Sequence, residues 1–161
     1  MLFRLFFLSV MCGLLSFSMT INAQTQSKPK KLADFSFYDL KGNVFTSKQL
    51  YYSNYLTVVY FDPTCEHCIE QTEQIVKNMS KFNKTKMLWV SIADPQSIAD
   101  FQKKYFPTQK NVVFLHDKNL KIFNYFDGLD DTPTFVIYDK NRNHVSTMGV
   151  SSVAEIVKHY K

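Results

Sequence analysis

Two cysteines three positions apart are the residues of this chain best suited to redox chemistry. Cys65 and Cys68 follow the apolar run 56–61, whose β-branched and aromatic composition is typical of a buried strand. Apolar residues then recur at helical spacing, so we expect a helix to begin at Cys65. A thiol at a helix start faces the positive end of the helix dipole and free backbone N–H groups, which favour the reactive thiolate.

This arrangement predicts thiol–disulfide exchange with one role for each cysteine. On the first turn of a helix the first thiol is exposed and the second is more buried. We therefore expect Cys65 to attack the disulfide of a partner and Cys68 to resolve the mixed disulfide. The intervening residues would tune this couple in opposite directions, because His67 favours the Cys65 thiolate and the negative charge of Glu66 opposes it.

A structural disulfide and a metal site are the alternatives for this cysteine pair. Closing a loop of four residues stabilises a fold by only about 2 kcal/mol on the chain-entropy formula, less than longer loops give. A structural zinc needs four ligands, and the sequence has no second Cys-x-x-Cys, while His116, His144 and His159 are isolated. We therefore expect no metal and no cofactor at the dithiol.

The first 23 residues have the pattern of a secretory signal peptide. Arg4 precedes the apolar stretch 5–19, and the small residue Ala23 precedes the expected cleavage point. The stretch is shorter than the roughly 20 residues that a spanning helix needs, although an uncleaved anchor stays the alternative. We expect a periplasmic protein with no stable membrane anchor. Cys12 would leave with the signal peptide.

Composition indicates one globular domain after this segment. Of the 161 residues, 45% are hydrophobic and 20% are charged, which suits a domain with a sizeable core. We expect a flexible lead-in at 24–31 and a single domain at 32–161. The net charge of +5 comes from lysines that are scattered along the sequence without a stripe of interleaved aromatics, so no nucleic acid is expected as a partner.

Hydrophobic periodicity predicts alternating strands and helices. We expect a hairpin at 35–46, strands at 56–61, 87–93, 111–115, 134–138 and 144–148, and helices at 65–82, 95–106, 119–126 and from 151 or 152 onward. The first strand–helix–strand unit implies a parallel pair with a right-handed crossover, and the terminal hairpins add antiparallel strands. The expected fold is α/β, with a mixed central sheet flanked by helices.

A second feature is Thr132-Pro133, directly before the strand expected at 134–138. Proline is tolerated at the first residue of a strand, so its spacing alone indicates no more than the start of an element.

Together these features resemble the thioredoxin superfamily, and within it the exported TlpA/ResA-like thiol–disulfide oxidoreductases. The likeness covers about residues 32–160. It is carried by Cys65-Glu66-His67-Cys68 at the strand-to-helix junction, by Thr132-Pro133-Thr134 and by Gly149 before the last helix. The N-terminal hairpin and the extra helix–strand insertion at about 95–115 also fit this branch.

The resemblance implies a fold, a reaction and partners. The fold is thioredoxin-like, with Pro133 cis and beside the dithiol, where Thr132 and Pro133 help to form the substrate groove. The reaction is exchange with protein thiols and disulfides, more often as a reductase, and a membrane-embedded thiol donor would supply electrons. Because His67 favours the Cys65 thiolate, we separately expect a reduction potential above that of thioredoxin.

Two other activities of this fold stay open. A copper-delivery protein uses two cysteines separated by three residues plus a distant histidine, whereas Cys65 and Cys68 are separated by two. A thiol peroxidase has a Pro-x-x-x-Thr-x-x-Cys pattern and an arginine at its site. Neither cysteine has that pattern, and Arg142 is the only arginine after the signal segment.

The sequence departs from its relatives around the first cysteine. Thr64 stands where Trp is usual and Asp62 where Ala is frequent, while Val59 occupies the position of the buried Asp of thioredoxins. A general base for the resolving cysteine is therefore not evident. Glu70 and Glu73 are candidates, although exposed carboxylates on the helix surface are the favoured interpretation.

Overall fold

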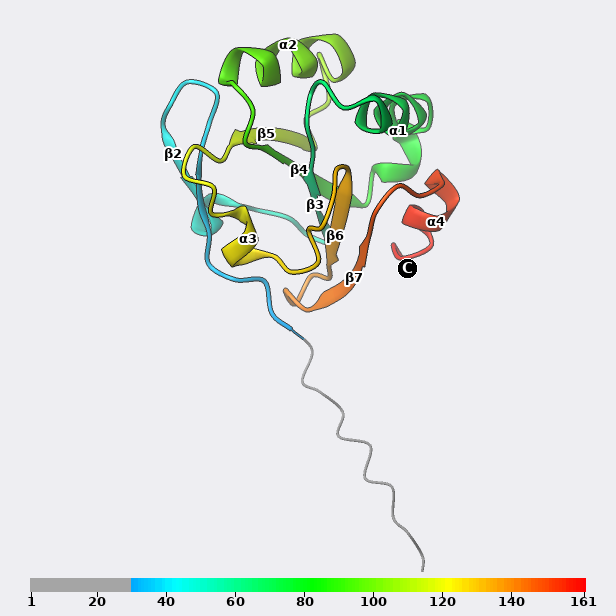
Figure 1. Ribbon diagram of the computed structural model, residues 1–161. Coiled ribbons are helices and arrows are strands. Elements are labelled where there is room, and N and C mark those ends of the chain that lie inside the picture. Colours follow the sequence, from blue (N-terminus) through cyan, green and yellow to red (C-terminus); the bar gives the residue numbers. More distant parts are fainter. Residues whose placement is uncertain (1–29) are drawn as a thin grey trace, which may run out of the picture.

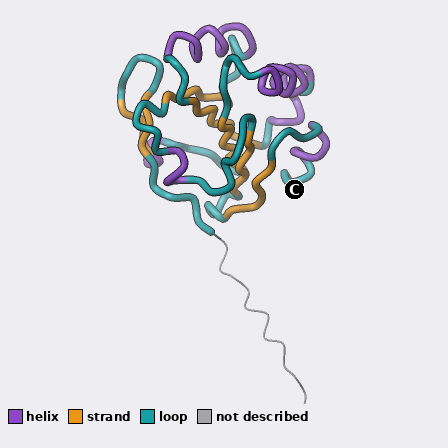
Figure 2. Tube along the Cα trace, viewed as in Figure 1, coloured by secondary structure: helices purple, strands orange, loops and turns teal. Residues whose placement is uncertain are grey.

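The computed structural model describes residues 30–161, which form a seven-stranded mixed sheet flanked by helices (Figures 1 and 2). The strand order is β2-β1-β5-β4-β3-β6-β7. The strands are β1 (Ser36–Tyr38), β2 (Val44–Thr46), β3 (Tyr55–Tyr60), β4 (Thr85–Ser91), β5 (Val112–His116), β6 (Thr134–Tyr138) and β7 (His144–Met148). The helices are α1 (Glu66–Lys77), α2 (Pro95–Tyr105), α3 (Ile122–Tyr125) and α4 (Val153–Val157), with short 3-10 helices at Ser47–Gln49 and Met79–Phe82. The expected signal peptide and residues 24–29 of the lead-in lie outside the described residues.

The pairing of the central strands determines where the dithiol lies. β3, β4 and β5 are parallel, so their carboxyl ends share one edge of the sheet. β6 runs antiparallel to β3 and begins at that edge, with Thr134 opposite Tyr60. The loop after β3, which carries Cys65, therefore meets the loop before β6, which carries Pro133.

Both faces of the sheet are covered, and β3 contributes to each because its side chains alternate. Val59 and Phe61 belong to the core beneath α1, α2 and α4, whereas Leu56 and Val58 belong to the core beneath α3 and the N-terminal segment. The first core is an aromatic cluster. Its tightly packed rings are Phe61, Trp89, Phe101, Phe106 and Phe114.

The expected α/β fold and all its strands are confirmed, while two helices are shorter than periodicity predicts. The helix expected at 65–82 ends at Lys77, because Asn78 leaves the helical region with φ −120° and ψ 25°. The helix expected at 119–126 is limited to α3. Leu120 takes a positive φ of 53°, and the Asp117 carboxylate accepts the N–H of Ile122 at 2.7 Å, where the helix starts.

No helix within residues 30–161 is long and apolar enough to cross a membrane.

Candidate active site

A short turn after β3 positions the first cysteine. The Asp62 carboxylate accepts hydrogen bonds from both the backbone N–H and the hydroxyl of Thr64, each at 2.7 Å. The Cys65 N–H donates to the carbonyl of Asp62 at 3.2 Å, and Cys65 is the N-cap residue of α1. The expected strand–turn–helix junction is therefore present, and Asp62, a departure from the family pattern, shapes it.

The two thiols have opposite electrostatic environments. Partial burial, the largest single influence, acts to raise the pKa of Cys65, but hydrogen bonds from the Cys68 backbone, the Thr132 side chain and the His67 backbone outweigh it and lower that pKa. Cys68 is completely buried, and this desolvation raises its pKa to about 12. At neutral pH Cys65 is therefore the thiol that ionises more readily, whereas Cys68 keeps its proton.

Two groups nevertheless favour the ionised form of the buried sulfur. The backbone N–H of Asp62 points at Cys68 Sγ from 3.5 Å, and the Thr132 side chain hydrogen-bonds it in the direction that lowers the pKa of Cys68. Both contacts stabilise a Cys68 thiolate once its proton has left. Sequence reasoning missed the part of Asp62, because a backbone donor leaves no signature in the residue type.

The segment before β6 contacts the dithiol across 67 positions of sequence. The Thr132–Pro133 peptide bond is cis, as the family resemblance implies. The Cys65 thiol donates to the Thr132 carbonyl at 3.6 Å. The structure thus brings together Cys65, Cys68 and Thr132, with Pro133 next in the chain.

The two residues between the cysteines extend into solvent. Glu66 and His67 are exposed, and His67 Nδ1 lies 3.8 Å from the Glu70 carboxylate, with both side chains 68% exposed. The contribution of His67 to the Cys65 thiolate comes from its backbone N–H. Tuning by the Glu66 and His67 side chains stays a prediction.

A groove of about 240 Å³ adjoins Thr132. Its lining is mixed: apolar side chains include Ile92 and Phe123, which are 41% and 48% exposed, and the acidic side chains are Asp62, Asp130 and Asp131. No lysine or arginine of the described chain lines it. The family resemblance implies a substrate groove at Thr132 and Pro133. Sequence reasoning missed the acidic residues that line this one, although the pair of aspartates directly before Thr132-Pro133 was a visible signal.

Charged residues proposed as a general base lie on the surface. Glu70 and Glu73 are exposed, in agreement with the favoured interpretation. Val59, at the position of the buried Asp of thioredoxins, is completely buried and apolar, so it cannot accept a proton. Within residues 30–161 no group of three or more His, Cys, Asp and Glu side chains is arranged to hold a metal ion.

Comparison with known proteins agrees with this geometry. The chain matches the AhpC/TSA family over residues 29–145, and no curated protein matches it. Among solved structures, a peroxidoxin BcpB from Mycobacterium tuberculosis is 13% identical, with a TM-score of 0.66 and coverage of 82% of this chain and 94% of that one. A secreted M. tuberculosis disulfide oxidoreductase homologous to E. coli DsbE is 17% identical, with a TM-score of 0.63 over 78% and 93% of the two chains. Yeast Sco1 is 15% identical, with a TM-score of 0.60 over 81% and 98%.

At these identities the solved structures establish the shared fold, and the family match extends over most of the chain. The expected thioredoxin-like resemblance is confirmed. This chain belongs to the AhpC/TSA family and is a thioredoxin-like redox enzyme.

Proposed function

We propose that this enzyme is an exported reductase of protein disulfides, with Cys65 as nucleophile and Cys68 as resolving thiol. The observation that carries the proposal is the inequality of the two thiols: Cys65 is partly exposed with a lowered pKa, and Cys68 is buried with a raised one. The attacking thiol must be accessible and ionised when the partner binds. The resolving thiol reacts only after the mixed disulfide has formed, so it can stay buried and protonated until then.

The reaction has two exchange steps. The Cys65 thiolate attacks one sulfur of a partner disulfide, so a bond forms between Cys65 and the partner while the partner's second sulfur leaves as a thiolate. Cys68 then loses its proton and attacks Cys65 Sγ, which closes the Cys65–Cys68 disulfide and releases the partner. The partner gains two electrons and two protons, and this chain loses them.

The substrate is a protein segment lying in the groove beside Thr132 and Pro133. Its apolar side chains Ile92 and Phe123 are exposed in the groove that Thr132 also lines, which suits contact with a polypeptide. The Thr132 carbonyl in turn accepts a hydrogen bond from the Cys65 thiol. Export by the leader 1–23 places the enzyme in the periplasm, and a membrane-embedded thiol donor returns the dithiol to its reduced form.

Single cysteine variants test this assignment. We expect Cys65→Ser to abolish insulin reduction and Cys68→Ser to accumulate mixed disulfides with its substrates, which can be trapped in the native cell and identified. Activity that persists in Cys65→Ser would refute the mechanism. Oxidation of Cys65 by hydrogen peroxide in preference to protein disulfides would instead indicate a thiol peroxidase, and tight copper binding by the reduced protein would indicate copper delivery.

A further inference from the structure

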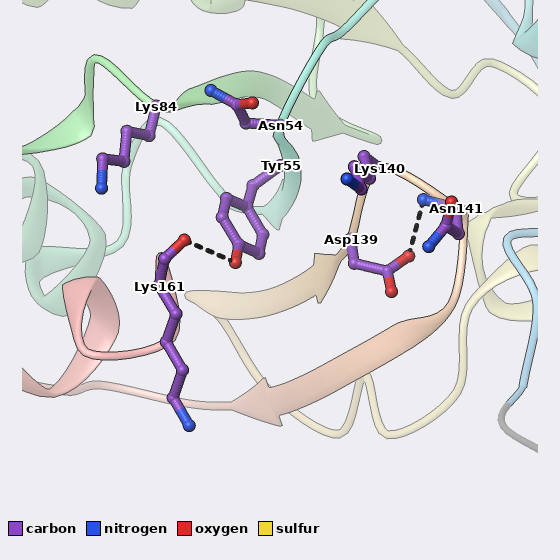
Figure 3. A pocket seen from close by; sticks show the side chains of 7 residues that line it. All are labelled: Asn54, Tyr55, Lys84, Asp139, Lys140, Asn141 and Lys161. Atoms are coloured by element: carbon purple, nitrogen blue, oxygen red, sulfur yellow. Dashed lines mark hydrogen bonds between the residues drawn. The ribbon is translucent and has the colours of Figure 1, made fainter.

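The end of the sheet opposite the dithiol gathers five lysines around two adjoining hollows. The first hollow, of about 400 Å³, is lined by Lys84, Lys140 and Lys161 (Figure 3). The second, of about 290 Å³, is lined by Lys84, Lys86 and Lys110. Tyr55 lines both hollows, and its ring occupies the middle of the view in Figure 3. We call this surface the lysine pole.

The lysine pole lies at the far end of the central strands from the reaction site. β3 starts with Tyr55 at the pole and ends with Tyr60 beside the acidic groove, a length of about 16 Å at 3.3 Å per residue. β6 runs the other way, from Thr134 next to Pro133 to the turn that carries Lys140. The groove lined by three aspartates and the lysine pole therefore lie at opposite ends of the central strands.

Little negative charge opposes these lysines. Asp139 is the only acidic side chain in the described residues that lines either hollow. Its carboxylate already accepts the N–H groups of Asn141 and Asn143, both at 2.8 Å, and the Asn143 amide at 2.9 Å. The ion pairs among residues 30–161 include none of the five lysines. The positive charge of the pole is thus available to an external anion.

Tyrosines accompany the lysines. Tyr51 is 85% exposed, and Tyr52 and Tyr55 are half-buried in the same surface. Tyrosine is favoured at membrane–water interfaces, where its ring contacts the acyl boundary and its hydroxyl stays hydrated.

The chain enters the domain beside this pole. The carbonyl of Lys30 accepts the N–H of His144 at 2.7 Å, and Lys31 forms a β-bridge with Asn143. Lys31 Nζ also donates to the carbonyl of Asn141 at 2.9 Å, and Asn141 lines the first hollow. Lys31 therefore adds a further positive charge beside the lysine pole.

We propose that the lysine pole docks on the anionic phospholipid headgroups of a membrane surface and leaves the dithiol facing away from the membrane. Clustered lysines are attracted to anionic leaflets, and this attraction is screened by salt. The proposal relies on export, which brings the protein beside a membrane, and is independent of the redox reaction.

Vesicle binding by the mature chain 24–161, which keeps every described strand and both cores, tests the proposal. We expect binding to vesicles of phosphatidylcholine containing roughly one-third phosphatidylglycerol, weak binding to phosphatidylcholine alone, and loss of the difference at high salt. Reversing three exposed lysines together, in Lys84→Glu/Lys140→Glu/Lys161→Glu, should weaken binding at least about tenfold. Circular dichroism establishes whether each variant is folded.

A matched variant distinguishes the effect of the lysine pole from the effect of net charge. Lys41, Lys118 and Lys121 are exposed and lie at the end of the sheet near the dithiol, so Lys41→Glu/Lys118→Glu/Lys121→Glu changes net charge equally and should bind within about twofold of the parent. Equal loss in both variants, or no preference for anionic vesicles, would overturn the proposal. Lysine-dependent binding to soluble polyglutamate without vesicle binding would also overturn it and indicate an acidic protein instead.

Discussion

Cys65 and Cys68 share one helical turn, yet hydrogen bonding dominates at one sulfur and burial at the other. Backbone donors at the start of α1 lower the pKa of Cys65 despite its partial burial. Complete burial raises the pKa of Cys68 to about 12. The order of the two exchange steps follows from this difference, because the Cys65 thiolate forms more readily than the Cys68 thiolate.

Alkylation by iodoacetamide measures this inequality directly. The rate follows the thiolate fraction, which increases as pH rises through the pKa of each thiol. Because the pKa of Cys65 is lowered, its alkylation should reach half its maximal rate at a lower pH than that of an ordinary exposed thiol. Cys68 in Cys65→Ser should stay almost unreactive to beyond pH 10, since its pKa is raised to about 12. Equal midpoints for the two thiols would contradict the assignment of roles.

Thr132 should influence the reduction potential. Its side chain acts on both sulfurs in the direction that lowers their pKa values, so Thr132→Val should raise the pKa of Cys65. A less stable thiolate makes the dithiol form less favourable, and the potential should become more negative.

A glutathione redox equilibrium measures that shift, with the wild-type enzyme expected above about −270 mV, the value for thioredoxin. Exposed Thr108 provides the control, and Thr108→Val should leave the potential unchanged. An unchanged potential in Thr132→Val would show that the threonine hydroxyl has no tuning role.

At the scale of elements, local pattern predicted which segments form strands and where the dithiol lies. The apolar run at β3 and the change to helical spacing at Cys65 are properties of neighbouring residues. The end of α1 and the start of α3 were not predictable in this way, because they depend on the backbone angles of Asn78 and on the Asp117 carboxylate. The groove beside Thr132 required tertiary structure, since it joins the loops after β3 and β4 with the segment before β6.

A buried hydrogen-bond network ties two central strands to the C-terminal segment. The Thr57 hydroxyl on β3 contacts the hydroxyl of Thr85 on β4 at 2.9 Å and that of Tyr160 at 2.7 Å. Thr57→Val leaves those buried hydroxyls without this partner, so the free energy of unfolding should fall by about 1–3 kcal/mol.

Urea denaturation of the reduced protein measures this loss. The surface substitution Thr108→Val, whose side chain is exposed, should change the free energy of unfolding by less than about 0.5 kcal/mol. A comparable effect of both substitutions would mean that the network contributes no specific stability.

At the scale of the molecule, folding gathers charges that are scattered along the sequence into two local clusters of opposite sign. The net charge is +5 and the lysines show no stripe in the sequence, yet five of them gather at one end of the sheet and three aspartates surround the groove at the other. Residues far apart in the chain meet at the ends of neighbouring strands, so this distribution could not be recognised before the sheet order was known.

The acidic groove should make the enzyme select among substrates by charge. Local potentials steer charged partners and raise their rate of association, and salt screens the effect. We expect kcat/KM to be higher for a disulfide peptide flanked by lysines than for the same peptide flanked by glutamates, with the ratio falling as ionic strength rises.

Asp130→Asn/Asp131→Asn removes two charges from the groove and should reduce the ratio severalfold, chiefly through KM. Asp34→Asn/Glu155→Gln removes the same charge from ion pairs outside the groove and should preserve the ratio. If the parent enzyme has the same kcat/KM for both peptides at low salt, the aspartates do not influence substrate choice. That result would not affect the two-step exchange at Cys65 and Cys68.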